Sequence, residues 1–122
     1  MEIGITMFVT QSSIHVSDLA RHCEDFGFES LWLPEHSVIP VHTTSPWGGA
    51  TDGIIPDWYY ECTDPFVSLA HASAVTENLK LGTGICLVPE RNPIVLAKEI
   101  ATLDHYSNGR FLFGIGSGWL KE

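Results

Sequence analysis

The alternation of apolar strand-like runs with amphipathic helical runs is the feature that most constrains how this chain folds. A buried strand needs a short apolar, β-branched run, whereas a surface helix needs apolar residues at every third or fourth position. The two patterns alternate along the chain, with strands predicted at 3–9, 30–33, 79–88 and 110–115, and helices at 17–26, 64–74 and 92–107. Strands that alternate with helices form parallel sheets with right-handed crossovers. The sequence therefore predicts an α/β fold, either a doubly wound sheet or a (β/α) barrel.

Capping residues predict where the helices begin and end. Asp64 and Asn92 each stand directly before a proline, the combination of N-cap and first helical residue that starts a helix. Ser17 is the predicted N-cap of the first helix. Phe26 is predicted to lie on the buried face of that helix, which ends before Gly27.

The segment 34–64 is predicted to be one long loop, because it contains several prolines and the pair Gly48-Gly49. Irregular segments of about thirty residues are uncommon in compact domains and tend to be lids or binding loops. The segment also carries four large aromatic residues, which either pack the loop onto the body of the protein or line a substrate pocket: Trp47, Trp58, Tyr59 and Tyr60.

The charge balance argues against two classes of partner. Six Lys and Arg residues against fifteen Asp and Glu residues give a formal charge of −9, so we expect neither nucleic acid nor an anionic membrane as a partner. The sequence has no apolar run of about 18 residues and no signal-type core after Met1. The three cysteines form no C-x-x-C pair and are predicted to be reduced thiols of a cytoplasmic protein.

Three clusters fall at the carboxyl ends of predicted strands, where parallel α/β folds bind ligands. They are Glu35-His36, Gly82–Ile85 and Gly114–Trp119. His36 is suited to acid–base catalysis, but a histidine at this position also serves as a structural hydrogen-bonding group. Adjacent side chains of extended backbone point in opposite directions, so we do not expect Glu35 and His36 to act on one atom.

The glycine-rich segment from Gly114 is not a dinucleotide fingerprint, because its spacing is Gly-x-Gly-x-Gly, Trp119 stands where the fingerprint has its third glycine, and no helix follows. Its glycines allow either a flat ligand or a neighbouring strand to approach the backbone closely. A metal site at His36, His42 and a loop carboxylate lacks any ligand spacing, and we predict no metal.

Three motifs together resemble the bacterial luciferase-like oxidoreductases, most closely the branch that uses the deazaflavin coenzyme F420. The motifs are Leu31–His36, Leu81–Ile85 with Pro89, and Asp104–Trp119, in the order and spacing of the family. The resemblance implies a (β/α)8 TIM barrel, a fold of eight strands and about 250 residues. Residues 1–122 are then expected to be the N-terminal part of that domain, with four of its strands and the long loop at 34–64.

The same resemblance implies a site. His36 matches the family's active-site histidine, and Gly84-Ile85 matches a strand bulge where the family often has a non-proline cis peptide behind the ring. The implied cofactor-binding residues are Gly82, Thr83, Gly84, Ile85, Gly116 and Ser117. The implied cofactor is coenzyme F420, with FMN as the alternative, for hydride transfer or oxygen activation on a small organic substrate. Some sugar-phosphate-oxidising members have a glutamate where Trp119 stands, so the resemblance does not extend to their substrate chemistry.

Half a barrel has consequences for partners. We expect either a homo-oligomer or assembly with a missing C-terminal half, which would contain the loops that commonly bind phosphate, and we expect the chain alone to be inactive. The alternative hypothesis is a non-catalytic half-barrel or assembly module with exposed apolar strand edges.

Overall fold

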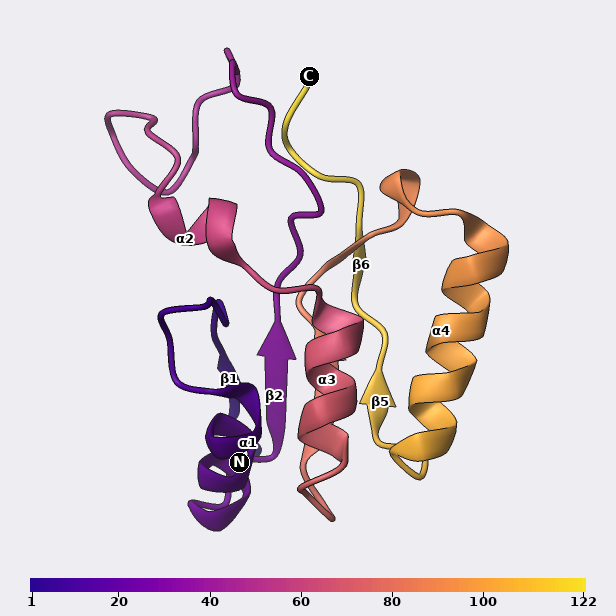
Figure 1. Cartoon of the computed structure of the whole chain (residues 1–122). Helices are drawn as coiled ribbons and strands as arrows, with labels where there is room; N and C mark the ends of the chain where they lie inside the picture. The colour runs from indigo at the N-terminus through magenta and orange to yellow at the C-terminus, as the bar shows by residue number, and fades with distance from the viewer.

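A computed structural model describes all residues 1–122 and shows one parallel sheet with helices on one face (Figure 1). The sheet has the strand order β1-β2-β3-β5, and a separate parallel pair joins β4 to β6. The strands are β1 (Gly4–Thr6), β2 (Ser30–Leu33), β3 (Lys80–Thr83), β4 (Cys86–Leu87), β5 (Phe111–Leu112) and β6 (Ile115–Gly116). The helices are α1 (Val16–Asp25), α2 (Asp57–Glu61), α3 (Pro65–Ser73) and α4 (Pro93–Tyr106), with a 3-10 turn at Val88–Glu90. The predicted α/β class with parallel strands is confirmed.

The strand register separates two faces of the sheet. Leu31 pairs with Leu81, and Leu81 pairs with Phe111; these side chains belong to the core beneath the helices, where both leucines are fully buried. On the opposite face Trp32 pairs with Gly82. A Cβ atom on Gly82 would overlap the indole of Trp32, so a glycine is required there for Trp32 to lie flat across the sheet.

Two of the four predicted strands are each divided in two. The run predicted at 79–88 breaks at Gly84-Ile85, which is a non-proline cis peptide, and the run at 110–115 breaks at Gly114. At the break the Thr83 hydroxyl donates to the Gly114 carbonyl at 2.8 Å and accepts from the Gly114 N–H at 3.0 Å. The Thr83 side chain thus replaces part of the backbone ladder, and β4 and β6 continue as a separate pair.

The predicted caps of two helices are confirmed, and the cap of α1 is wrong. The side chain of Asp64 accepts from Val67 N–H, and that of Asn92 accepts from the N–H groups of Ile94 and Val95. In α1 the N-cap is His15, not Ser17: His15 Nδ1 accepts from the Ser17 N–H at 3.2 Å. The helix therefore begins two residues earlier than predicted, because an imidazole nitrogen serves as the cap acceptor.

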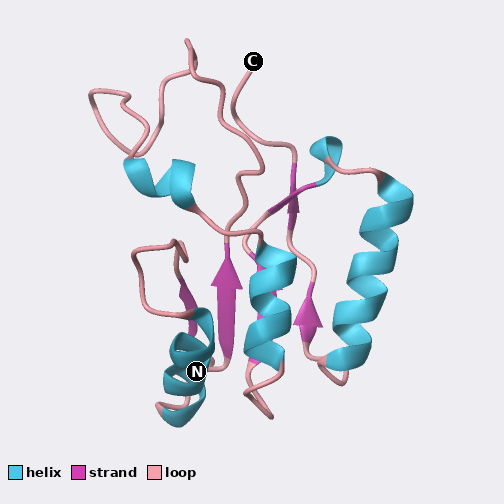
Figure 2. Cartoon of the chain, viewed as in Figure 1, coloured by secondary structure: helices cyan, strands magenta, loops and turns pink.

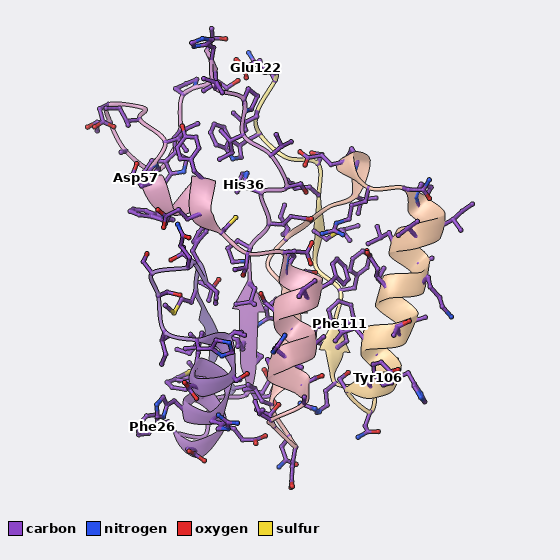
Figure 3. The ribbon with its side chains drawn as sticks, in the orientation of Figure 1. Phe26, His36, Asp57, Tyr106, Phe111 and Glu122 are labelled. Carbon is purple, nitrogen blue, oxygen red and sulfur yellow. The ribbon has the colours of Figure 1, made fainter.

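Phe26 does not belong to the buried face of α1, contrary to the prediction. The helix ends at Asp25, and Phe26 is its C-cap with 78% of its surface exposed. Figure 3 shows it at the end of the molecule opposite His36. The apolar periodicity of the sequence thus continues to Phe26, whereas Cys23 is the last buried residue of the helix.

The segment between β2 and α3 is irregular except for α2, a short helix that the prediction missed (Figure 2). The arrows of β2 and β5 point toward the end of the molecule where this segment, β6 and the C-terminus lie (Figure 1). All carboxyl ends of the parallel strands therefore face the long loop. Cys23, Cys62 and Cys86 are free thiols, as predicted, and none of the helices is both long and apolar enough to cross a membrane.

Candidate functional site

A cavity of about 530 Å³ lies at the carboxyl ends of the strands. It brings together five of the residues predicted for the site, which come from the end of β2, the β3–β4 junction and the end of β6: His36, Gly84, Ile85, Gly116 and Ser117. The remaining lining residues are Thr6, Phe8, Pro34, Glu35, Tyr59, Leu87, Gly118 and Trp119. Segments from both ends of the chain thus form one concave surface.

Gly82 and Thr83, also predicted to bind the cofactor, do not line this cavity. Gly82 lies beneath Trp32, and Thr83 is fully buried with its hydroxyl bonded to Gly114. The structure therefore gives both residues a packing role below the cavity.

The β3–β4 and β6 segments form one wall of the cavity. A Cβ atom on Gly116 would overlap the end of the Ile85 side chain, so Ile85 lies directly over the Gly116 backbone. Gly84 and Gly118 also line this wall and have no side chain to extend into the cavity. A wall of glycine backbone and one aliphatic side chain suits a flat ring.

His36 lies among aromatic rings at the other side of the cavity (Figure 3). Its ring centroid is 4.6 Å from that of Tyr59 and 6.2 Å from that of Trp119, the latter in an edge-to-face arrangement. Burial lowers the pKa of His36, and the negative charge of neighbouring Glu35 opposes only part of that shift. A neutral imidazole can accept a proton at one nitrogen while donating from the other.

Tyr59 and Trp119 also line the cavity, although no specific role was predicted for either residue from the sequence. Tyr59 lies 4.7 Å from Phe8 and 6.4 Å from Trp119 between ring centroids. The loop aromatics predicted at 47–60 therefore divide: Tyr59 packs on the body and lines the cavity, whereas Trp58 and Tyr60 are exposed. The aromatic composition of the loop was the available signal, but it does not reveal which ring points inward.

Beside His36, Glu35 is buried with only 3% of its surface exposed. It accepts from the Leu87 N–H at 2.6 Å, from Arg91 Nε at 2.7 Å and from the Ser37 hydroxyl at 3.2 Å. These contacts tie the end of β2 to the end of β4. They also agree with the expectation that Glu35 and His36 serve different purposes.

Arg91 is the centre of a charge network that sequence reasoning did not find. Besides Glu35 it contacts Asp64 at 2.6 Å and Glu99 at 3.1 Å, and its guanidinium lies 4.7 Å above the ring of Phe66. Burial alone would lower the pKa of Arg91, but the hydrogen bonds to Glu35 and Asp64 outweigh this effect and raise it. Arg91 thus forms ion pairs with three carboxylates of its own chain.

The lining residues fit the ring of a flavin or deazaflavin better than its phosphate. Apolar and aromatic side chains and the wall of glycines offer surfaces for stacking, while Thr6, His36 and Ser117 offer polar atoms for a ring edge. The lining contains no Lys and no Arg. No group of three or more His, Cys, Asp or Glu side chains is arranged to hold a metal ion.

The family model for luciferase-like monooxygenases matches residues 1–122, the whole chain. The chain belongs to this family. Among individual relatives, this luciferase-like chain is 43% identical over 120 residues to an uncharacterized protein of Mycobacterium tuberculosis, covering 98% of the chain and 43% of the relative. It is 31% identical over 105 residues to limonene 1,2-monooxygenase of Rhodococcus erythropolis, covering 86% of the chain and 22% of that enzyme.

The solved structures give the same assignment. The structure of the coenzyme F420-dependent tetrahydromethanopterin reductase of Methanopyrus kandleri matches 96% of the chain with a TM-score of 0.71 at 28% identity. The expected luciferase-like TIM-barrel type is thereby confirmed. The luciferase-like chain spans 27% of that structure and less than half of the length of the relatives named above.

Proposed function

We propose that this chain forms the ring-facing part of a coenzyme F420 site in an oxidoreductase that acts on a small organic substrate. The observation that carries the proposal is the cavity in which His36, Gly84-Ile85 and Gly116-Ser117 meet at the carboxyl ends of the strands. When bound, F420 would supply hydride transfer, and FMN in its place would supply oxygen activation. The protein supplies the position of the ring and the polar groups around it.

F420 is preferred to FMN because the matched reductase of Methanopyrus kandleri is described as F420-dependent and is 28% identical to the chain over the part that the two share. In our proposal Gly84, Ile85, Gly116 and Ser117 support one face of the ring. Tyr59 and Trp119 limit the space on the side of His36 and exclude water from it.

His36 is proposed as the proton-handling residue. Its lowered pKa keeps the imidazole neutral near pH 7, the form that accepts a proton from a substrate group or donates a hydrogen bond to the ring edge. Because its neighbour Glu35 is engaged by Arg91 and Leu87, the imidazole is the one ionisable group of this pair available to the cavity.

Fluorescence and absorbance titrations with F420 and with FMN test the proposal. We expect saturable binding of F420 with quenching of tryptophan emission, because Trp119 lines the cavity. Gly116→Val is expected to weaken cofactor binding at least tenfold, because the added side chain would push Ile85 away from its place over the Gly116 backbone. Ala101→Val is the matched control, because Ala101 is exposed on α4 and lines neither this cavity nor the one beside it.

Saturable binding of FMN but not F420 would reverse the choice of cofactor. Failure of both cofactors to bind the folded protein would refute the proposed function. Because we expect the chain alone to be inactive, the catalytic role is tested by turnover after assembly with a complementary half of the barrel. Unchanged turnover of His36→Ala in that assembly would remove the catalytic role.

A second candidate, a half-barrel that acts in assembly, is favoured by apolar residues exposed along the β5–β6 edge. Phe113 and Ile115 are 40% and 63% exposed, and a sheet edge with free hydrogen-bonding groups pairs readily with another strand. On this proposal the partner is a second copy of the chain or a complementary half of the barrel. Light scattering that shows a stable monomer at high concentration would count against it.

A further inference from the structure

A second cavity of about 480 Å³ adjoins the first and shares two of its walls, Tyr59 and Trp119. It lies between the long loop and the segment that follows β6, at the end of the molecule where Figure 3 labels Asp57 and Glu122. The other lining residues are Ser45, Pro46, Trp47, Gly48, Gly49 and Lys121. None of the residues predicted to bind the cofactor lines this second cavity.

Three aromatic rings shape the second cavity. The rings of Trp47 and Tyr59 are 5.7 Å apart between centroids at 71°, and those of Tyr59 and Trp119 are 6.4 Å apart at 87°. When neighbouring rings are steeply inclined to one another, an additional flat ring can pack against them. Such a ring is stabilised both by the surface it buries and by the ring–ring geometry.

The position of Trp47 is determined by its surroundings. A Cβ atom on Gly49 would overlap the Trp47 indole, so the ring lies against the glycine backbone. The backbone N–H of Trp47 also donates to the Gly53 carbonyl at 2.8 Å, and the ring centroids of Trp47 and Trp58 are 6.3 Å apart in an edge-to-face arrangement. The aromatic wall is therefore held in place by the loop itself.

The charge of the second cavity is unlike that of the chain. Its lining contains no acidic residue, and its one cation, Lys121, forms none of the salt bridges of the structure. The neighbouring carboxylate of Glu122 is held by Thr44 and by the Ser45 hydroxyl at 2.8 Å, and Glu122 is not a lining residue. In a chain with a formal charge of −9, an acid-free cavity with a free ammonium group favours an anionic ligand.

We propose that the second cavity is a subsite for an aromatic carboxylate, with the flat ring between Trp47 and Trp119 and the carboxylate at Lys121. The identification of this ligand as the substrate rests on the proposed function, because the shared wall of Tyr59 and Trp119 places its ring beside the cofactor cavity. The binding of the aromatic carboxylate does not depend on a cofactor.

The test uses 2-naphthoate as the probe and uncharged 2-naphthamide as its matched control. Indole N–H signals in a ¹H–¹⁵N spectrum report on each of the four tryptophans. Saturating 2-naphthoate is expected to shift the signals of Trp47 and Trp119. The signal of Trp32, whose indole donates to Ser30 on the sheet, is expected to stay in place. Movement of Trp32 alone, or no saturable shift, would overturn the proposal.

Variants separate the contribution of ring stacking from that of the Lys121 charge. Trp47→Ala is expected to weaken both probes by about fivefold or more, and Trp47→Phe serves if the alanine variant is not folded by circular dichroism. Lys121→Gln is expected to weaken 2-naphthoate by about threefold and to leave 2-naphthamide unchanged. Lys98→Gln on α4, which does not line the cavity, is the control. Equal effects of Lys121→Gln on both probes would contradict the charge assignment.

Titration of the cofactor-loaded protein distinguishes this proposal from the proposed function. If neither F420 nor FMN binds but 2-naphthoate still shifts Trp47 and Trp119, the proposed function fails and the subsite stands. If a cofactor binds and excludes 2-naphthoate competitively, the two cavities are one site and the separate subsite is overturned.

Discussion

Replacing Arg91 by methionine is the most informative single perturbation of this chain. Methionine keeps an unbranched apolar stem of similar length but removes the guanidinium that contacts Glu35, Asp64 and Glu99. The side chain of Glu35 is 1% exposed and that of Arg91 is 14% exposed, so water cannot replace the lost partner at Glu35 without local opening.

The magnitude follows from the unequal exposure of the three carboxylates. Removing one partner of a buried ion pair costs about 3–5 kcal/mol, because the remaining charge is left uncompensated. The side chains of Asp64 and Glu99 are 43% and 37% exposed, and such partly solvated pairs each contribute at most about 1 kcal/mol. We therefore expect Arg91→Met to lower the free energy of unfolding by about 3–5 kcal/mol, mostly through Glu35.

Urea unfolding followed by tryptophan fluorescence measures this loss. Arg21→Met is the matched control, because Arg21 pairs with Asp18 on the surface with both side chains more than half exposed, and it is expected to cost less than about 1 kcal/mol. The double variant Glu35→Gln/Arg91→Met is expected to recover part of the stability, since the glutamine amide carries no charge.

The reasoning is refuted if Arg91→Met and Arg21→Met lower the free energy of unfolding equally. It is also refuted if the double variant is no more stable than Arg91→Met. Either result would mean that Glu35 is solvated in the folded chain and does not connect the ends of β2 and β4 through its charge.

Three further predictions concern packing, protonation and thiol reactivity. Gly114→Ala is expected to lower the free energy of unfolding by about 1–3 kcal/mol, because its Cβ atom would overlap the Thr83 carbonyl, whereas Gly48→Ala should change it little; urea unfolding compares the two. Burial holds the pKa of His36 below its ordinary value near 6.5, so the unfolded chain binds the proton more readily. Neutral His36 therefore contributes stability above the pKa of the unfolded chain, and this contribution is lost as the pH falls toward the pKa of the folded chain. A His36→Gln variant whose free energy of unfolding keeps the full pH dependence of wild type between about pH 5 and 7 would contradict this assignment. Burial raises the pKa of the Cys86 thiol to about 12, so Cys86 should resist a disulfide reagent at pH 8 until urea unfolds the chain, and rapid native labelling of Cys86, located by mass spectrometry, would argue against that burial.

The helices and strands were largely predictable because their signals are local. Asp64 and Asn92 cap their helices through N–H groups two or three residues ahead, a distance over which residue type and spacing are decisive. The N-cap of α1 was predicted wrongly because residue type favoured Ser17 as the acceptor. In the structure the imidazole of His15 accepts the hydrogen bond instead. The family resemblance implied a bulge at Gly84-Ile85, although not the division of the strand into β3 and β4.

The site was predictable only in part. The clusters at His36, Gly84-Ile85 and Gly116-Ser117 are recognisable because parallel strands bring their carboxyl ends to one edge. The contacts of Arg91 with Glu35 and of Tyr59 with Trp119 join residues more than fifty positions apart, and no local pattern encodes such pairs.

The order of elements, the parallel sheet and the end at which ligands bind all follow from residue patterns, because periodicity and capping act within a few positions of the chain. Packing of the folded chain assigned Gly82 and Thr83 to the layer below the cavity and Tyr59 and Trp119 to its walls. The physical reason is that strand register and loop placement determine which side chains meet. Strand register and loop placement in turn depend on packing throughout the core, to which Leu31 and Leu81 belong although they lie outside the site.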